Sequence, residues 1–154
     1  MKFSVDSNFL ICSLQSWNPH HDATLADLEH RLTAGQSLHL IPHTLLETYS
    51  VMTRMPEPFR KPPALVKDLL NRNFREFPLT DVPLATDVWL LLTDLAQKGL
   101  GGGQTYDRWI AWTAYKAGIQ ELVTWNVKHF LPHDFSGLEI VAPGKGECPE
   151  DRRK

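Results

Sequence analysis

The stretch Phe3-Ser4-Val5-Asp6-Ser7-Asn8 places a carboxylate directly after a short apolar run near the start of the chain. Residues 3–5 read as a short strand, and Asp6 follows that strand directly. A strand that ends in this way projects the carboxylate from the carboxyl edge of a sheet. Open α/β folds place their ligand sites at that edge.

Three further stretches repeat the pattern of a carboxylate or amide where an apolar run meets a turn or a helix start. They are Leu45-Leu46-Glu47, Thr105-Tyr106-Asp107-Arg108 and Val123-Thr124-Trp125-Asn126. Three carboxylates that converge at one edge repel one another unless a cation lies between them. Because magnesium and manganese prefer oxygen ligands, the pattern predicts a metal-assisted phosphoryl site.

Length and composition indicate one globular domain. A chain of 154 residues can bury a substantial core but is too short for two ordinary domains. The apolar fraction of 42% and the charged fraction of 22% are typical of soluble globular proteins. A net charge of -2 gives no general attraction to nucleic acid, although a local basic patch could still provide it.

The two cysteines, Cys12 and Cys148, lie far apart and have no metal-binding or redox spacing. We therefore expect two free thiols in a reducing compartment. The N-terminal residues do not resemble a signal peptide, and no stretch approaches the roughly 20 apolar residues needed to span a bilayer. These features predict a cytoplasmic protein without a membrane segment.

Strand-like and helix-like segments alternate along the chain, which is typical of a parallel sheet with crossover helices. Strands are expected at 3–5, 38–41, 76–79, 122–125 and 138–141, and helices at 21–32, 44–53, 63–71, 84–97 and 107–117. We expect a single domain over residues 1–142 and a flexible tail over 143–154.

Each candidate site residue also has a purely structural explanation. Thr44 and Glu47 have the spacing of a capping box, and Asp6 could be a solvated strand end. Asp107 could interact with a helix dipole, which contributes about 0.3–1 kcal/mol. Asn126 could occupy a turn, because asparagine tolerates left-handed backbone geometry. The seven histidines have no zinc-site spacing, so a zinc site is not expected.

Taken together in order and spacing, these residues resemble a PIN-domain ribonuclease of the VapC toxin type. The resemblance extends from Lys2 to about Val141. It is carried by Val5-Asp6-Ser7-Asn8, Thr44-Leu45-Leu46-Glu47, the run from Tyr106 to Ala111, and the run from Leu122 to Phe130. It implies a three-layer α/β/α sandwich around a mostly parallel sheet of about five strands.

In this family resemblance, Asp6, Glu47 and Asp107 match the three principal acidic positions, and the fourth falls on Asn126. An amide can bind a metal through its carbonyl oxygen, but it brings no charge. We therefore expect a second metal ion to be held more weakly than the first.

The resemblance implies hydrolysis of RNA phosphodiester bonds by metal-activated water. Asp6 and Asp107 would be direct ligands of Mg²⁺ or Mn²⁺, and Glu47 would bind through water or orient the attacking group. Thr124 would assist by bonding Asp6 or a metal-bound water. Its alternative explanation is a β-branched residue that favours the strand.

Arg54, Arg108 and Lys128 are the candidate phosphate contacts. The alternative is that these cations merely solvate exposed helix faces. The tryptophans at positions 17, 109, 112 and 125 could stack on RNA bases, or could belong to the core or a dimer interface.

The resemblance further implies RNA as substrate, a homodimer, and a VapB-type antitoxin whose tail enters the acidic groove. Two alternatives remain open. Asn126 allows a PIN-fold RNA-binding module without catalysis. A magnesium-dependent phosphatase of the haloacid-dehalogenase type also starts with an aspartate after its first strand, but it needs a second aspartate where Asn8 stands.

Overall fold

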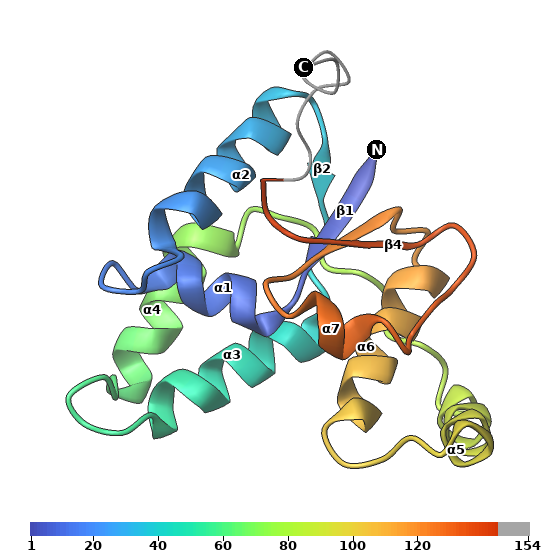
Figure 1. Ribbon diagram of the computed structural model, residues 1–154. Helices are drawn as coiled ribbons and strands as arrows, with labels where there is room; N and C mark the ends of the chain where they lie inside the picture. Colours follow the sequence, from blue (N-terminus) through green and yellow to red (C-terminus); the bar gives the residue numbers. More distant parts are fainter. Residues whose placement is uncertain (145–154) are drawn as a thin grey trace.

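The computed structural model describes residues 1–144 of the chain. Figure 1 shows its strands and helices in space. The strands are β1 (Lys2–Val5), β2 (Ser37–Leu38), β3 (Glu121–Val123) and β4 (Glu139–Val141). The helices are α1 (Ser7–Leu14), α2 (His21–Thr33), α3 (Pro42–Arg54), α4 (Pro63–Phe74), α5 (Asp87–Lys98), α6 (Gln104–Lys116) and α7 (Val127–Phe130).

The four strands form one parallel sheet in the order β2-β1-β3-β4. In the register, Phe3 pairs with Leu38 on one side and with Glu121 on the other. Because all the strands run in the same direction, their carboxyl ends meet at one edge of the sheet. The ends of β1 and β3 lie side by side there, which brings Asp6 close to Thr124.

The prediction of a strand at 76–79 is wrong. Within residues 1–144 the sheet has four strands, where about five were expected. Leu79 forms only an isolated parallel bridge with Leu40. The Leu40 amide donates to the Pro78 carbonyl, and the Thr80 amide donates to the Leu40 carbonyl. Pro78 has no amide hydrogen, so the ladder has no donor at that position.

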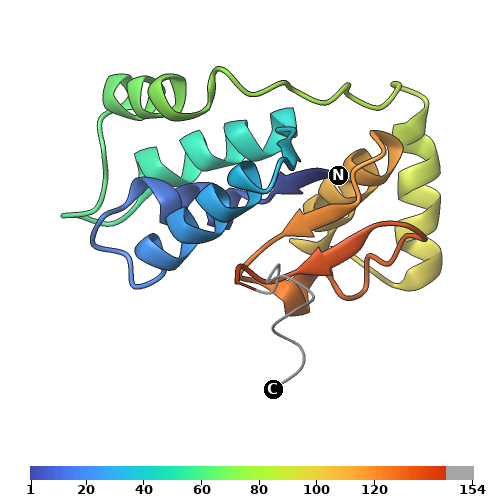
Figure 2. The ribbon, with the colours of Figure 1, turned by 90° about the horizontal axis from the view of Figure 1, so that it is seen from above.

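Two groups of helices cover the two faces of the sheet, as expected for a three-layer sandwich. On one face, Phe3 and Val5 pack with α1, together with parts of α3 and α4. On the other face, Leu122 packs with the small residues Ala111 and Ala114 of α6 and with α7. Figure 2 shows the blue and green helices on one side of the strands and α5 and α6 on the other.

The five predicted helices are present, and two short ones were missed. α1 begins directly after Asp6, and α7 begins directly after Asn126. α6 begins three residues before Asp107, so that this aspartate lies in the first turn of the helix and not before it. α5 begins at Asp87, whose side chain accepts a hydrogen bond from the Leu84 amide.

The expected flexible tail falls mainly on residues 145–154, which lie outside the described part of the chain, as does Cys148. The first tail residues are ordered: Pro143 is buried, and the Gly144 amide donates to Asp27 Oδ1 at 2.8 Å. Cys12 is a buried free thiol. Among residues 1–144, no helix combines the length and apolarity needed to cross a membrane.

Candidate active site

Asp6 is the most buried carboxylate at the carboxyl edge of the sheet, with 4% of its surface exposed. Its Oδ1 accepts a hydrogen bond from the Phe9 amide at 2.9 Å, so the side chain caps α1. Its Oδ2 accepts a hydrogen bond from the Thr124 hydroxyl at 2.6 Å. The Asp6 carboxylate is therefore fixed by two hydrogen bonds and is not a solvated strand end.

Burial raises the pKa of Asp6 from 3.8 to about 6. The bonds from Thr124 and from the Phe9 amide act in the opposite direction and lower this pKa. The negative charges of Glu47 and Asp107 raise it further. The three carboxylates are therefore close enough to repel one another.

Glu47 lies one turn into α3 and is half-buried. The capping-box explanation is wrong, because α3 begins at Pro42 and Thr44 lies inside the helix, where its hydroxyl donates to the Ile41 carbonyl. Glu47 Oε2 is buried without a hydrogen-bond partner, and His43 Nε2 lies 3.7 Å from it. The carboxylate thus has an oxygen free for a cation or a water molecule.

Asp107 completes the acidic group from the first turn of α6. Partial burial and the charge of Glu47 raise its pKa, and the His129 side chain lowers it. Its position also satisfies the helix-dipole explanation, since the first turn of a helix favours negative charge. The two explanations are compatible, because a dipole contact leaves the outer oxygen atoms free.

Asn126 is exposed and precedes α7. The left-handed turn explanation is wrong, because its φ is -99°. Its backbone amide donates to the Thr124 hydroxyl oxygen at 2.9 Å. The Thr124 hydroxyl therefore links the Asn126 backbone to the Asp6 carboxylate. A preference of threonine for strands does not by itself explain these two hydrogen bonds.

These residues offer oxygen ligands of the kind that divalent metal ions bind. The donor set is all oxygen, one buried oxygen of Glu47 has no partner, and no salt bridge within residues 1–144 joins Asp6, Glu47 or Asp107 to a lysine or arginine. However, no three His, Cys, Asp or Glu residues in that range lie close enough to hold one ion together. The set suits an ion that has one or two direct protein ligands and reaches the others through water, as Mg²⁺ usually does.

The expected phosphate contacts divide into two classes. Arg54 and Lys128 are exposed. Arg108 was expected at the site but is buried: its Nε donates to Asp94 Oδ2 at 2.8 Å, and its guanidinium lies 4.2 Å from the centre of the Phe135 ring. Arg108 therefore ties α6 to α5, and its assignment as a phosphate contact was wrong.

The four tryptophans considered as base-stacking candidates mostly pack against other parts of the protein. Trp125 stacks on His20 and donates from Nε1 to the Thr24 hydroxyl oxygen. Trp112 packs edge-on against Phe135. The remaining two are Trp17, which is partly exposed beside Phe59, and Trp109, which lines a small pocket.

Two rings at the site were not predicted to be functional. The ring of His43 and the ring of Tyr106 stack with their centres 5.5 Å apart. A weak sequence signal was available, because His43 precedes Glu47 by one helical turn and Tyr106 directly precedes Asp107.

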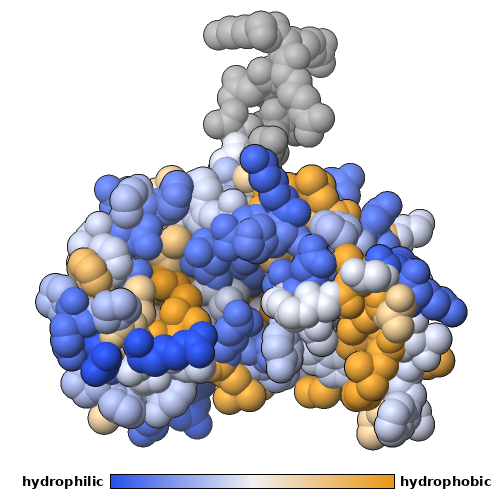
Figure 3. Space-filling view, turned by 60° about the horizontal axis from the view of Figure 1, so that its bottom comes forward, coloured by the Kyte–Doolittle hydropathy of each residue, from blue (hydrophilic) through white to orange (hydrophobic). Residues whose placement is uncertain are grey.

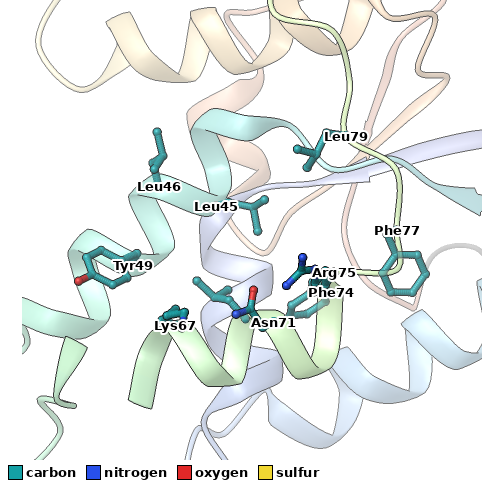
Figure 4. Close-up of a pocket in the computed structure, with 10 residues that line it drawn as sticks. Leu45, Leu46, Tyr49, Lys67, Asn71, Phe74, Arg75, Phe77 and Leu79 are labelled. Carbon is teal, nitrogen blue, oxygen red and sulfur yellow. The ribbon is translucent and has the colours of Figure 1, made fainter. Parts of the chain in front are cut away.

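An apolar groove of about 330 Å³ runs between α3 and α4 (Figure 4). Leu45, Leu46 and Tyr49 reach it from α3, and Lys67 and Asn71 reach it from α4. None of the three carboxylates lines the groove. It is therefore a surface separate from the acidic site.

A second apolar surface lies on α5. Figure 3 shows a hydrophobic area on the right of the molecule, the side on which α5 lies in Figure 1, while hydrophilic residues fill the middle of this face. The exposed apolar residues of this helix are Val88, Trp89, Leu90 and Leu92. Only Leu91 and Leu95 of its apolar residues are buried.

Comparisons with known proteins agree on one family, although no family model matches the chain. Ribonuclease VapC40 of Mycobacterium tuberculosis is 34% identical over 124 residues, which cover 76% of this chain and 81% of the relative. Ribonuclease VapC27 of the same species is 35% identical over 138 residues, covering 90% of this chain and 94% of the relative.

Solved structures show the same fold. The complex of VapBC2 from Rickettsia felis with a DNA fragment from its promoter contains a chain with a TM-score of 0.68 at 21% identity, covering 92% of this chain and 98% of that one. VapC20 of M. tuberculosis, described as a toxin that cleaves the sarcin-ricin loop, has a TM-score of 0.53 at 16% identity and covers 78% of this chain and 86% of that one. The sequence identity of 34% to VapC40 and 35% to VapC27, over more than two thirds of this chain and of each relative, shows that this chain belongs to the family of VapC-type PIN-domain ribonucleases.

Proposed function

We propose that this protein is a divalent-metal-dependent endoribonuclease and the toxin of a VapBC-type toxin–antitoxin pair. The observation that carries the proposal is the convergence of Asp6, Glu47 and Asp107. The charge of Glu47 raises the pKa of both aspartates, and no salt bridge within residues 1–144 joins the three carboxylates to a lysine or arginine. Family membership supports the nuclease reading over a phosphatase of the haloacid-dehalogenase type.

In this proposal, Asp6 and Asp107 would hold the metal ion, and Glu47 would reach it through water. When bound, Mg²⁺ or Mn²⁺ supplies a positive charge for the phosphate and lowers the pKa of a water molecule. Thr124 and the Phe9 amide fix the two oxygens of Asp6, so that this carboxylate needs no reorganisation to act. Partial burial of the site strengthens each of these electrostatic interactions.

Asn126 takes the fourth position of the acidic set in the proposal. Its neutral side chain adds an oxygen ligand but no charge, so one metal ion is bound more tightly than a second. Arg54 and Lys128 are the cations best exposed to contact RNA phosphates. The cytoplasm is the proposed location, since the RNA substrate is found there.

A cleavage assay tests the function. Purified protein free of any antitoxin is incubated with structured RNAs, including tRNA, and with single-stranded DNA, in Mn²⁺ or in EDTA. Asp6→Asn is compared with Asp22→Asn, which removes an exposed first-turn carboxylate of α2 far from the acidic edge in sequence. We expect RNA cleavage that needs the metal, is lost in Asp6→Asn and persists in Asp22→Asn.

A folded wild-type protein that binds RNA but leaves it intact in every metal would contradict the enzymatic proposal. That result would favour a PIN-fold RNA-binding module, and Asn126→Asp would then test whether a fourth carboxylate restores cleavage.

We also propose a VapB-type antitoxin as partner, which the likeness to the VapBC2 chain suggests. The groove between α3 and α4 supports this assignment, because it is apolar and carries the cations Lys67 and Arg75 among its lining residues. These features suit an apolar antitoxin segment with acidic flanks. Leu79→Glu, at an exposed lining residue, should weaken binding of a candidate antitoxin in size-exclusion chromatography without loss of RNA cleavage.

A homodimer is the third part of the proposal. The exposed apolar face of α5 would be covered by a second copy of the chain, because a face of this kind is costly to leave in water. A two-fold dimer can bury the same face of both copies at once.

A further inference from the structure

Two aromatic rings border the acidic site, and neither has a role in the proposed cleavage. Tyr106 precedes Asp107 on α6, and His43 lies one turn before Glu47 on α3. Their rings are stacked, with centres 5.5 Å apart and an angle of 13° between the planes. His43 Nε2 lies 3.7 Å from Glu47 Oε2, so the ring pair adjoins the carboxylates.

The outer ring of the pair is largely open to solvent. Tyr106 has 57% of its surface exposed. Tyr115, on the same helix, differs because it stacks closely on Phe135 at 5.1 Å. Tyr106 therefore adds little to the core, and its position beside the acidic cluster needs another explanation.

The inner ring of the pair faces a small apolar pocket. His43 lines a hollow of about 190 Å³ together with Leu46, Val82 and Trp109. Trp109 lies one helical turn after Tyr106. The carboxylates are thus flanked on one side by aromatic and apolar surface and not by further charge.

We propose that the Tyr106–His43 pair and the adjoining pocket form a nucleobase subsite, on which an unpaired base next to the cleaved phosphate stacks. This inference rests on the proposed ribonuclease function and deepens it. Single-stranded RNA exposes bases that stack on aromatic side chains, and two parallel rings extend such a stack. The subsite would favour cleavage where the RNA is unpaired, with limited preference among bases because every base has a flat face.

Equilibrium binding of two probes tests the subsite directly. The probes are a short fluorescent oligoadenylate and an oligomer of equal length built from abasic ribose phosphates, both measured in Asp6→Asn protein so that no cleavage occurs. Tyr106→Ala should weaken oligoadenylate binding by about 5- to 30-fold and leave binding of the abasic oligomer unchanged. Tyr106→Phe should bind as Asp6→Asn alone does, since the ring and not the hydroxyl is required.

Tyr115→Ala is the matched control, because it removes a partly exposed tyrosine from the same helix away from the acidic site. His43→Phe should keep the affinity for oligoadenylate, whereas His43→Ala should lose it. In the cleavage-competent protein, Tyr106→Ala should raise KM for RNA more than it lowers kcat. A normal circular dichroism spectrum and melting temperature would show that each variant folds.

Several results would overturn the subsite. If Tyr106→Ala weakened the binding of both oligomers equally, Tyr106 would contact the RNA backbone and not a base. Unchanged RNA binding with weakened antitoxin binding would assign the ring pair to a protein interface. In either case, RNA cleavage by the protein with Tyr106 intact would show that the proposed function holds while the subsite fails. Absence of both RNA binding and cleavage in the wild type would reject the two together.

Discussion

The Thr124 hydroxyl donates a hydrogen bond of 2.6 Å to the Asp6 carboxylate across 118 positions of sequence. The same hydroxyl oxygen accepts the Asn126 amide hydrogen. Parallel pairing of β1 with β3 makes this possible, because it places the two strand ends side by side. Thr124 is thus a positioning residue that orients a carboxylate of the acidic site.

Thr124→Val should shift the pH dependence of cleavage. The hydroxyl bond lowers the pKa of Asp6, so its loss moves that pKa further above about 6. More Asp6 is then protonated near neutral pH, and protons compete with the metal ion. We expect about a tenfold lower rate near pH 7, consistent with roughly 1.5–3 kcal/mol for a hydrogen bond to a charged group, and recovery at higher pH or higher Mn²⁺.

Thr124→Ser is the control for that variant, because it keeps the hydroxyl and should restore the wild-type profile. The measurement is the rate of RNA cleavage over a series of pH values at fixed Mn²⁺. A parallel fall in rate at every pH would argue that Thr124 has only a structural role.

Asp6→Asn should stabilise the metal-free fold while it abolishes cleavage. The pKa of Asp6 in the folded state is above its ordinary value, so the ionised form destabilises the fold at pH above about 6, and this cost disappears at low pH. Asparagine keeps the helix cap without the charge. We expect a gain of about 1–3 kcal/mol near pH 7.5 in urea unfolding, shrinking near pH 4.

Addition of Mg²⁺ or Mn²⁺ should raise the melting temperature of the wild type and leave Asp6→Asn nearly unchanged. A metal-induced shift of equal size in both proteins would place the ion elsewhere.

His133→Phe should reduce the loss of stability in acid. His133 is fully buried, and burial together with the charge of Arg108 lowers its pKa from 6.5 to about 4, against the opposing effect of Asp94. A pKa lowered in the folded state means that protonation favours unfolding, so stability is lost as the pH falls from 6.5 towards 4. The wild type should lose about 3 kcal/mol more than the variant over that range.

The comparison is made by urea unfolding at several pH values, with the ring-to-ring contact to Phe130 retained by the new phenylalanine. Identical slopes of stability against pH in the two proteins would show that His133 does not titrate in this way.

Arg108→Met should destabilise the protein without changing how it binds RNA. Removing this cation breaks a salt bridge with the partly exposed Asp94 and a contact with Phe135, at a cost of about 1–3 kcal/mol. Lys128→Met, at an exposed residue, should instead weaken RNA binding and reduce its dependence on salt. Thermal melts and binding at several salt concentrations separate the two effects.

Trp89→Glu should convert a dimer into a monomer. Trp89 is 73% exposed on the apolar face of α5, so a charge there blocks burial against a second copy but costs the isolated chain little. Leu131→Glu is the control, because Leu131 is 64% exposed on a different part of the molecule. Light scattering after size exclusion should give a dimer mass for the control and a monomer mass for Trp89→Glu.

The fold class and the candidate acidic residues could be predicted from sequence patterns alone. Alternation of strands and helices requires a parallel sheet, and such a sheet gathers its strand ends at one edge. Asp6 follows a strand, and Asp107 and Glu47 lie near the starts of helices, so their approach could be predicted from local patterns. Family resemblance added the order in which these residues appear.

Tertiary contacts, which local patterns do not report, set which side chains face the site and which pack in the core. Arg108 and Asp107 are neighbours in sequence, yet helix geometry sends one into the core beside Asp94 and leaves the other at the acidic edge. The bond from Thr124 to Asp6 and the stacking of Tyr106 on His43 join segments that are distant along the chain. Periodicity reports the local backbone, whereas such contacts depend on how the elements pack, and that packing is set by the whole core.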